Sequence, residues 1–278
     1  MLKTAIAYLG DRGLLPEISG NAATPGAADA GEWETFAECL RSRRGISFWW
    51  RDDDVGGDGR NILRRKMHER RLENMLALLD RYGIPAVFAV APYKLRRYSA
   101  GQIALLKKYG AYAAMHGICH RNNAGPGRNA SEFPSGCDVE AALSAILKHK
   151  RELEEIFGNM LLPVFVPPWN TMCEELEARL RASGFTAISK YNRPSGKHDD
   201  DNVDVDFIDW RKRDLRDERA VLADIVTLLR NEDIRVIGLM NHHKVVSRRG
   251  LVFFDKLFST LTRHSDNVAW IIPHRPRT

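Results

Sequence analysis

Short apolar runs alternate with longer amphipathic segments from Gly45 to the end of the chain. The apolar runs have the length and the Val, Ile, Phe and Trp content of buried strands, whereas most segments between them repeat apolar residues every three or four positions, as helices do. The predicted strands are Ile46–Trp50, Ile84–Ala91, Ala111–Met115, Pro163–Val166, Thr186–Tyr191, Val203–Trp210, Arg235–Met240 and Val268–Ile272. The predicted helices are Asn61–Tyr82, Gln102–Tyr109, Asp138–Phe157, Thr171–Ser183, Asp217–Arg230 and Leu251–Arg263.

Residue types at the ends of these segments favour the same boundaries. Asp138 and Thr171 are predicted N-caps, and Glu174 completes a capping box with Thr171. About eight strands alternating with helices favour an α/β barrel over an open sheet. The connection 192–202 is polar and lacks a helical pattern, so the expected fold is an irregular (β/α)7–8 barrel of a distorted TIM-barrel type.

Residues 1–44 form a predicted N-terminal extension and linker, and residues 45–278 form the barrel. Gly20–Gly31 is rich in Ala and Gly, as linkers are, and Trp33–Arg43 has a helical pattern. The apolar run at the N-terminus is too short for a secretory signal, and no stretch approaches the roughly 18 residues that span a bilayer. We therefore expect a cytoplasmic protein; the oligomeric state is open.

The composition, 44% hydrophobic and 28% charged, is ordinary for a soluble enzyme. The net charge of +6 is concentrated partly in Arg60–Arg71 and Arg211–Arg219. Acidic residues are interleaved with both segments, so solvated helix faces are preferred over an acidic substrate or a peripheral contact with an anionic membrane, which stay open. No nucleic-acid motif accompanies the charge. The four cysteines form no C-x-x-C pair, which argues against a disulfide framework: Cys39, Cys119, Cys137 and Cys173.

Polar residues follow four of the predicted strands, at the end of a β/α barrel where active sites gather. Asp52–Asp54 follow the first strand and His116 and His120 the third. Pro167–Asn170 follow the fourth strand, and His242–His243 the seventh. Four such features at four strand ends predict one shared site.

Of two neighbouring carboxylates, one can bind a metal while the other accepts a proton. The competing interpretation of the triplet is an acidic turn that caps the next helix. Two His residues four positions apart can share a metal, and Gly117 after His116 favours a loop exit over a helix. With one Asp they form a set that suits zinc. Cys119 between them is expected to be packed rather than to act as a ligand. Trp169 suits stacking on a sugar, although a core position is nearly as well supported.

These fragments, in this order, resemble the polysaccharide deacetylase family, carbohydrate esterase family 4, over roughly residues 45–275. The resemblance implies hydrolysis of the N-acetyl group of an amino sugar in an oligo- or polysaccharide or its precursor. It implies a base, Asp53, an acid, His242, and a divalent metal, preferably zinc, on Asp54, His116 and His120. It further implies a substrate pocket made by three residues: Pro168, Trp169 and Trp210.

The chain departs from the family pattern in the groove segment, where Val166 replaces an Arg that pairs with an Asp, here Asp206 or Asp209, and tunes the base. We expect Arg51 to supply that charge. Asp52-Asp53 could align in place of Asp53-Asp54, and the choice between His242 and His243 is open. Two other functions compete: hydrolysis of another C–N bond, such as a cyclic amide, and glycan binding without catalysis. Without an export signal, a soluble oligosaccharide, a nucleotide-linked sugar or a lipid-linked precursor would be the substrate.

Overall fold

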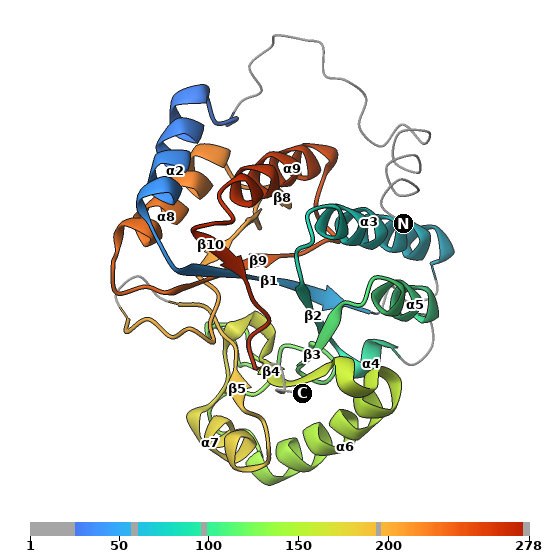
Figure 1. Ribbon diagram of the computed structural model, residues 1–278. Coiled ribbons are helices and arrows are strands. Elements are labelled where there is room, and N and C mark those ends of the chain that lie inside the picture. Colours follow the sequence, from blue (N-terminus) through green and yellow to red (C-terminus); the bar gives the residue numbers. More distant parts are fainter. Residues whose placement is uncertain (1–25, 57–60, 96–98, 193–195, 275–278) are drawn as a thin grey trace.

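The computed structural model describes residues 26–56, 61–95, 99–192 and 196–274. Its centre is a parallel sheet in the order β5-β4-β3-β2-β1-β9-β6, with β10 also paired to β1. An isolated parallel bridge between Tyr191 and Val203 connects the two ends of this order, so the sheet curls into a barrel (Figure 1). The strands are β1 (Ile46–Val55), β2 (Ala86–Val90), β3 (Tyr112–His116), β4 (Leu161–Val166), β5 (Ala187–Ile188), β6 (Val205–Asp206), β9 (Val236–Asn241) and β10 (Val268–Trp270). The expected irregular α/β barrel is confirmed.

Helices surround this sheet because their apolar faces pack against its outer side chains. In α9 the buried residues Phe254 and Phe258 lie edge-on against the Trp50 ring of β1, with ring centroids 5.3 and 5.2 Å away. A smaller cluster that includes Trp49 and Val166 fills the barrel interior. The helices are α2 (Ala30–Ser42), α3 (Ile62–Arg81), α4 (Pro92–Leu95), α5 (Ala100–Lys108), α6 (Val139–Phe157), α7 (Glu174–Ala182), α8 (Glu218–Arg230) and α9 (Arg248–Arg263), with short 3-10 turns η1 (Gly158–Met160) and η2 (Pro168–Asn170).

Helix α2 packs beside α8 on the barrel (Figure 1). Its buried residues Trp33, Phe36 and Leu40 belong to the main hydrophobic core. Asp29 caps the helix and forms a capping box with Glu32. The extension assigned from the sequence thus includes a helix that shares the core of the barrel, while residues 1–25, including the N-terminal apolar run, lie outside the described residues. Among the described helices, none is long and apolar enough to cross a membrane.

Three local predictions were wrong. Thr171 does not cap α7: its hydroxyl donates to the carbonyl of Ala130, and Cys173 is the N-cap residue, without a side-chain cap bond. The predicted strand 203–210 divides in two, because Asp206 accepts a hydrogen bond from the backbone of Ile208 and the chain turns there. The second half, β7 (Ile208–Asp209), pairs antiparallel with β8 (Asp214–Leu215). The Asp triplet lies inside β1 rather than beyond it. The predicted N-cap Asp138 is confirmed by its bond to the backbone of Ala141.

Candidate metal centre

Asp54, His116 and His120 meet at the carboxyl end of the sheet. Their ligand atoms all lie within 4.8 Å of one another. Asp54 Oδ1 is 3.6 Å from Nε2 of His116 and 3.3 Å from Nε2 of His120. His116 ends β3, and His120 lies in the loop that follows, so the expected exit from strand to loop is observed.

The backbone of β1 aims Asp54 at the two imidazoles. Strict alternation along a strand would put Asp54 on the outer face, with Trp50 and Asp52. The pairing of β1 with β2 instead shifts register between Asp52 and Val55, and Asp54 has a φ of 73°. Such a left-handed conformation is costly for a residue other than glycine and tends to occur where a functional side chain is positioned.

The three side chains present a donor set suited to a divalent metal ion. His116 Nδ1 lies 3.0 Å from the carbonyl of Val166, so this nitrogen donates and Nε2 keeps its lone pair. Burial lowers the pKa of His120 to about 4, which leaves that imidazole neutral at pH 7. Asp54 Oδ1 is buried with no hydrogen-bond partner. Although burial alone would raise it, the pKa of Asp54 lies well below the usual value because of His116, His242 and His120. A buried, ionised carboxylate with an unpartnered oxygen beside two lone-pair nitrogens fits a cation.

Asp53 lies next to this group and is held by Arg51. The guanidinium contacts both carboxylate oxygens, Nε to Oδ1 at 2.9 Å and Nη2 to Oδ2 at 3.0 Å, and both side chains are buried. Arg51 also donates to Ser189 and to Oδ1 of Asn170. Arg51 therefore contacts the carboxylate assigned as the base, in a barrel where Val166 contributes only an apolar side chain and a carbonyl.

Asp52 points away from the metal group, toward β9. Its carboxylate accepts hydrogen bonds from the backbone nitrogen of His243 at 3.0 Å and from Nδ2 of Asn241 at 2.6 Å, and Nδ1 of His243 lies 2.5 Å from it. Asp52, Asn241 and His243 are fully buried. This contact ties the ends of β1 and β9 together and keeps both Asp52 and His243 out of the site.

His242 faces the opposite way from His243 and contacts Trp210, with ring centroids 4.5 Å apart. Nδ1 of His242 is buried without a hydrogen-bond partner. The indole nitrogen of Trp210 donates to Oδ2 of Asp206 at 3.0 Å, and burial raises the pKa of Asp206, an effect that the charge of His242 partly offsets. Asp206 thus belongs to the surroundings of His242 and forms no hydrogen bond or ion pair with Arg51. Asp209 lies further out, where it accepts bonds from the backbone of Arg211.

Trp169 and Trp210 are 38% and 50% exposed and flank the site from two sides. The Trp169 ring lies 4.3 Å from the ring of His120, centroid to centroid. Pro168, expected to line the same pocket, is buried. A Cβ on Gly117 would come within 2.6 Å of its ring, so Pro168 packs beneath the turn that carries the two His residues.

Glu132 is a part of the site that the sequence reasoning missed. This buried carboxylate accepts hydrogen bonds from the backbone nitrogens of Ile118 at 3.0 Å and Cys119 at 2.8 Å, and from the Cys119 thiol. Burial, together with Glu132, raises the pKa of Cys119 to about 11, so the thiol is a donor rather than a thiolate ligand. Glu132 was the one acidic residue between Gly117 and Cys137, a signal that could have identified it.

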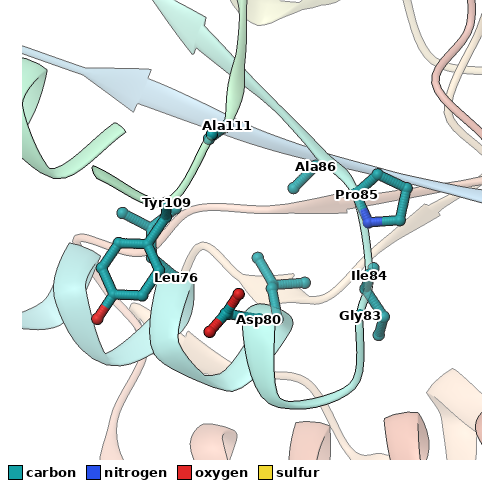
Figure 2. A pocket seen from close by; sticks show the side chains of 10 residues that line it. Leu76, Asp80, Gly83, Ile84, Pro85, Ala86, Tyr109 and Ala111 are labelled. Atoms are coloured by element: carbon teal, nitrogen blue, oxygen red, sulfur yellow. The ribbon is translucent and has the colours of Figure 1, made fainter. Parts of the chain in front are cut away.

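A cavity of about 230 Å³ lies at the opposite end of the sheet, where β2 and β3 begin (Figure 2). Leu76, Ile84 and Pro85 line much of it, and Asp80 is its one acidic residue. It holds no cluster of metal-ligating side chains. Among the described residues, the one group of side chains suited to a metal ion lies at the carboxyl end of the barrel.

No family model and no curated protein matches the sequence. Solved structures match in fold. One is a putative polysaccharide deacetylase from Mycobacterium smegmatis, with 17% identity and a TM-score of 0.56, over 81% of this chain and 86% of that one. Another is the Bc1960 peptidoglycan N-acetylglucosamine deacetylase, with 11% identity and a TM-score of 0.51, over 84% and 94%. The chain has the fold of the polysaccharide deacetylases.

This fold also occurs in a CE4 family pseudoenzyme from Bacillus anthracis, with 14% identity and a TM-score of 0.50, over 82% of this chain and 64% of that one. The shared fold alone therefore does not decide whether this chain is a catalyst. That question rests on the residues of the site.

Proposed function

We propose that this protein is a metal-dependent deacetylase that hydrolyses the N-acetyl group of an amino sugar in an oligo- or polysaccharide or its precursor. The observation that carries the proposal is the meeting of Asp54, His116 and His120 beside the Arg51-bound carboxylate of Asp53. Two imidazoles and one carboxylate form a set that zinc favours, and such a set leaves a coordination position for water or substrate.

The residues around the ion divide the chemistry between them. Asp54, His116 and His120 would hold a divalent ion, which would supply Lewis acidity toward the acetyl carbonyl. Asp53 accepts a proton from the water that attacks this carbonyl, while Arg51 fixes the direction of the carboxylate. His242 donates a proton to the sugar nitrogen as the C–N bond breaks, because an amine leaves poorly unless it is protonated. The products are acetate and the free amino sugar.

The surroundings of His242 support its role as the acid. His243, the other candidate, is buried against Asp52 and has no path to a substrate. His242 contacts Trp210, which Asp206 orients through the indole nitrogen. With Trp169 on the far side, Trp210 presents an aromatic face to the apolar side of a sugar ring.

Acetate release from a panel of N-acetylhexosamine oligosaccharides tests the proposal. We expect activity that a chelator removes and zinc restores, and that Asp54→Ala abolishes. Asp233→Ala is a matched control, since Asp233 is an exposed carboxylate just before β9, at the end of that strand opposite His242, and its side chain makes no hydrogen bond or ion pair with a described residue. Chelator-resistant activity, or full activity in Asp54→Ala, would contradict the metal assignment. If only a cyclic amide were hydrolysed, the same site would instead belong to a hydrolase of another C–N bond, the competing function.

A further inference from the structure

A basic cavity of about 500 Å³ is lined in part by residues that closely follow His242 and Trp210 in the chain. It is formed by the N-terminal half of α3, the β7–β8 hairpin and the segment that follows β9. Five Lys or Arg residues and one Asp line it, so its formal charge is 5 − 1 = +4 with His68 neutral. The charged lining residues are Arg64, Arg71, Lys212, Arg213, Lys244 and Asp214.

The ammonium group of Lys244 donates to the backbone carbonyl of Gly56, and the charge of the four other cationic side chains is little neutralised by described neighbours. Arg71 donates to the backbone carbonyl of Lys244, a contact that positions the guanidinium without cancelling its charge. Lys212 pairs with Asp209 at 3.5 Å, and its side chain is 75% exposed, so this ion pair is weak. Arg64 and Arg213 form no ion pair with any described residue, and both are exposed. Asp214 accepts a bond from the backbone of Leu215.

The cavity is connected to the site through two short stretches of chain. Lys244 follows His242 by two residues, and Lys212 follows Trp210 by two residues. At no more than about 3.6 Å per residue, each lysine Cα lies within about 7 Å of the Cα of a residue assigned to substrate chemistry. These short separations relate the cavity to the substrate that Asp54 and His242 are assigned to bind.

We propose that this cavity binds the phosphate or diphosphate group of a phosphorylated N-acetylamino sugar. The inference rests on the proposed deacetylase function and names its substrate class. Several guanidinium and ammonium groups around one hollow match the oxygens of a phosphate better than a neutral glycan, and charged hydrogen bonds to phosphate are the strong ones. The volume admits a group larger than a single carboxylate.

Binding of inorganic pyrophosphate to the full-length protein tests the cavity independently of turnover. We expect saturable binding by calorimetry that weakens at least about tenfold in Arg64→Gln/Lys212→Gln, because two charged hydrogen bonds are lost. Arg151→Gln, at an exposed position on α6 whose side chain bonds to no described residue, is the matched control and should bind as the parent does. Absence of saturable binding, or equal binding by the double variant and the parent, would overturn the proposal.

Three further measurements test whether pyrophosphate binds the cavity or the metal site, and whether the natural phosphate belongs to a nucleotide or a lipid. Binding that persists in Asp54→Ala shows that pyrophosphate occupies the cavity rather than the metal, whereas its complete loss there overturns the proposal. UDP-N-acetylglucosamine and vesicles of phosphatidylcholine with phosphatidic acid are then tested as competitors. Displacement by one of them assigns a nucleotide-linked or a lipid-linked source, and displacement by neither overturns the assignment. Failure of acetate release with intact pyrophosphate binding would contradict the deacetylase function alone.

Discussion

Arg51 and Asp53 lie two residues apart on β1 and form a two-point ion pair inside the barrel, Nε to Oδ1 at 2.9 Å and Nη2 to Oδ2 at 3.0 Å. Side chains two positions apart on a strand share a face, so both point inward with Trp49. The pair is buried, and Asn170 and Ser189 accept further bonds from the guanidinium. A base and its cationic partner are thus carried by one strand.

We predict that Arg51→Met lowers both stability and catalysis. The substitution leaves the Asp53 carboxylate buried without its partner, which costs about 3–5 kcal/mol of the free energy of unfolding. Denaturant unfolding measures this loss. Catalysis falls because the carboxylate is no longer held toward the attacking water, which is read as kcat/KM and its pH profile on the substrate found by the acetate panel.

A double variant separates the two effects. Arg51→Met/Asp53→Asn replaces both members of the pair, so it should recover part of the lost stability and none of the activity. If Arg51→Met unfolded at the parent's denaturant midpoint with an unchanged pH profile, the role of Arg51 would be refuted.

Asp52 is predicted to support the fold rather than the reaction. Its carboxylate accepts bonds from the backbone of His243 and the side chain of Asn241, and all three residues are fully buried. Asp52→Ala leaves those donors unsatisfied and should cost about 2–5 kcal/mol of unfolding free energy. Equilibrium dialysis against zinc should give more nearly parental affinity for Asp52→Ala than for Asp54→Ala. Parental zinc affinity in Asp54→Ala, with the loss appearing in Asp53→Ala instead, would restore the alternative alignment, in which Asp52 is the base and Asp53 the ligand.

The alternation of apolar and amphipathic segments predicted most of the barrel because each strand and helix buries a face of its own. It failed where a tertiary contact overrode the local pattern. The run 203–210 is apolar enough for one strand, but the bond from Ile208 to Asp206 turns the chain into the β7–β8 hairpin. Thr171 has the residue type of a cap, yet its hydroxyl bonds to the loop carbonyl at Ala130.

In the candidate site, too, the local pattern predicts some positions and tertiary structure decides others. Period-two alternation alone puts Arg51 and Asp53 on one face and Asp52 on the other. It would also put Asp54 with Asp52, and only the register shift of β1 and a φ of 73° bring Asp54 to the His pair. Glu132 was missed because two of its three donors are backbone nitrogens, so the sequence marks it only as the one acidic residue between Gly117 and Cys137.

Glu132 is predicted to hold the turn that carries the two His residues. Glu132→Gln replaces an oxygen that accepts a backbone bond by an amide group that cannot accept it, so one of the nitrogens of Ile118 and Cys119 loses its partner. We expect zinc affinity, measured by competition with a chromophoric chelator, to fall about 10- to 100-fold. Cys119→Ala, which removes only the thiol donor, should keep nearly parental affinity. Equal losses in the two variants would point to general disruption of the loop.

Substitution of Gly117 tests how closely the turn that carries His116 and His120 is packed. The φ of Gly117 is 56°, and an added Cβ would lie 2.1 Å from Oε2 of Glu132 and 2.6 Å from Pro168. Gly110 has a φ of 63° with nothing within 4 Å of such a Cβ, so Gly110→Ala carries only the backbone cost of about 1 kcal/mol. Gly117→Ala should exceed that cost by about 1–3 kcal/mol in denaturant unfolding and weaken zinc binding. Indistinguishable midpoints for the two variants would contradict the contact between Gly117 and Glu132.

The metal-free protein should lose stability as the pH falls from about 6.5 toward 4. Burial lowers the pKa of His120 from 6.5 to about 4, so within this window the unfolded chain binds a proton that the folded protein does not. Unfolding free energy therefore rises with pH across the window, and His120 contributes about 1–2 kcal/mol of this rise once solvent screening is allowed for. Denaturant titrations at several pH values measure the slope, and His120→Asn should remove its share. Zinc should stabilise the parent more at pH 7 than at pH 4, because protons and the metal compete for the same nitrogen. A slope in His120→Asn equal to that of the parent would show that His120 is not the group that titrates.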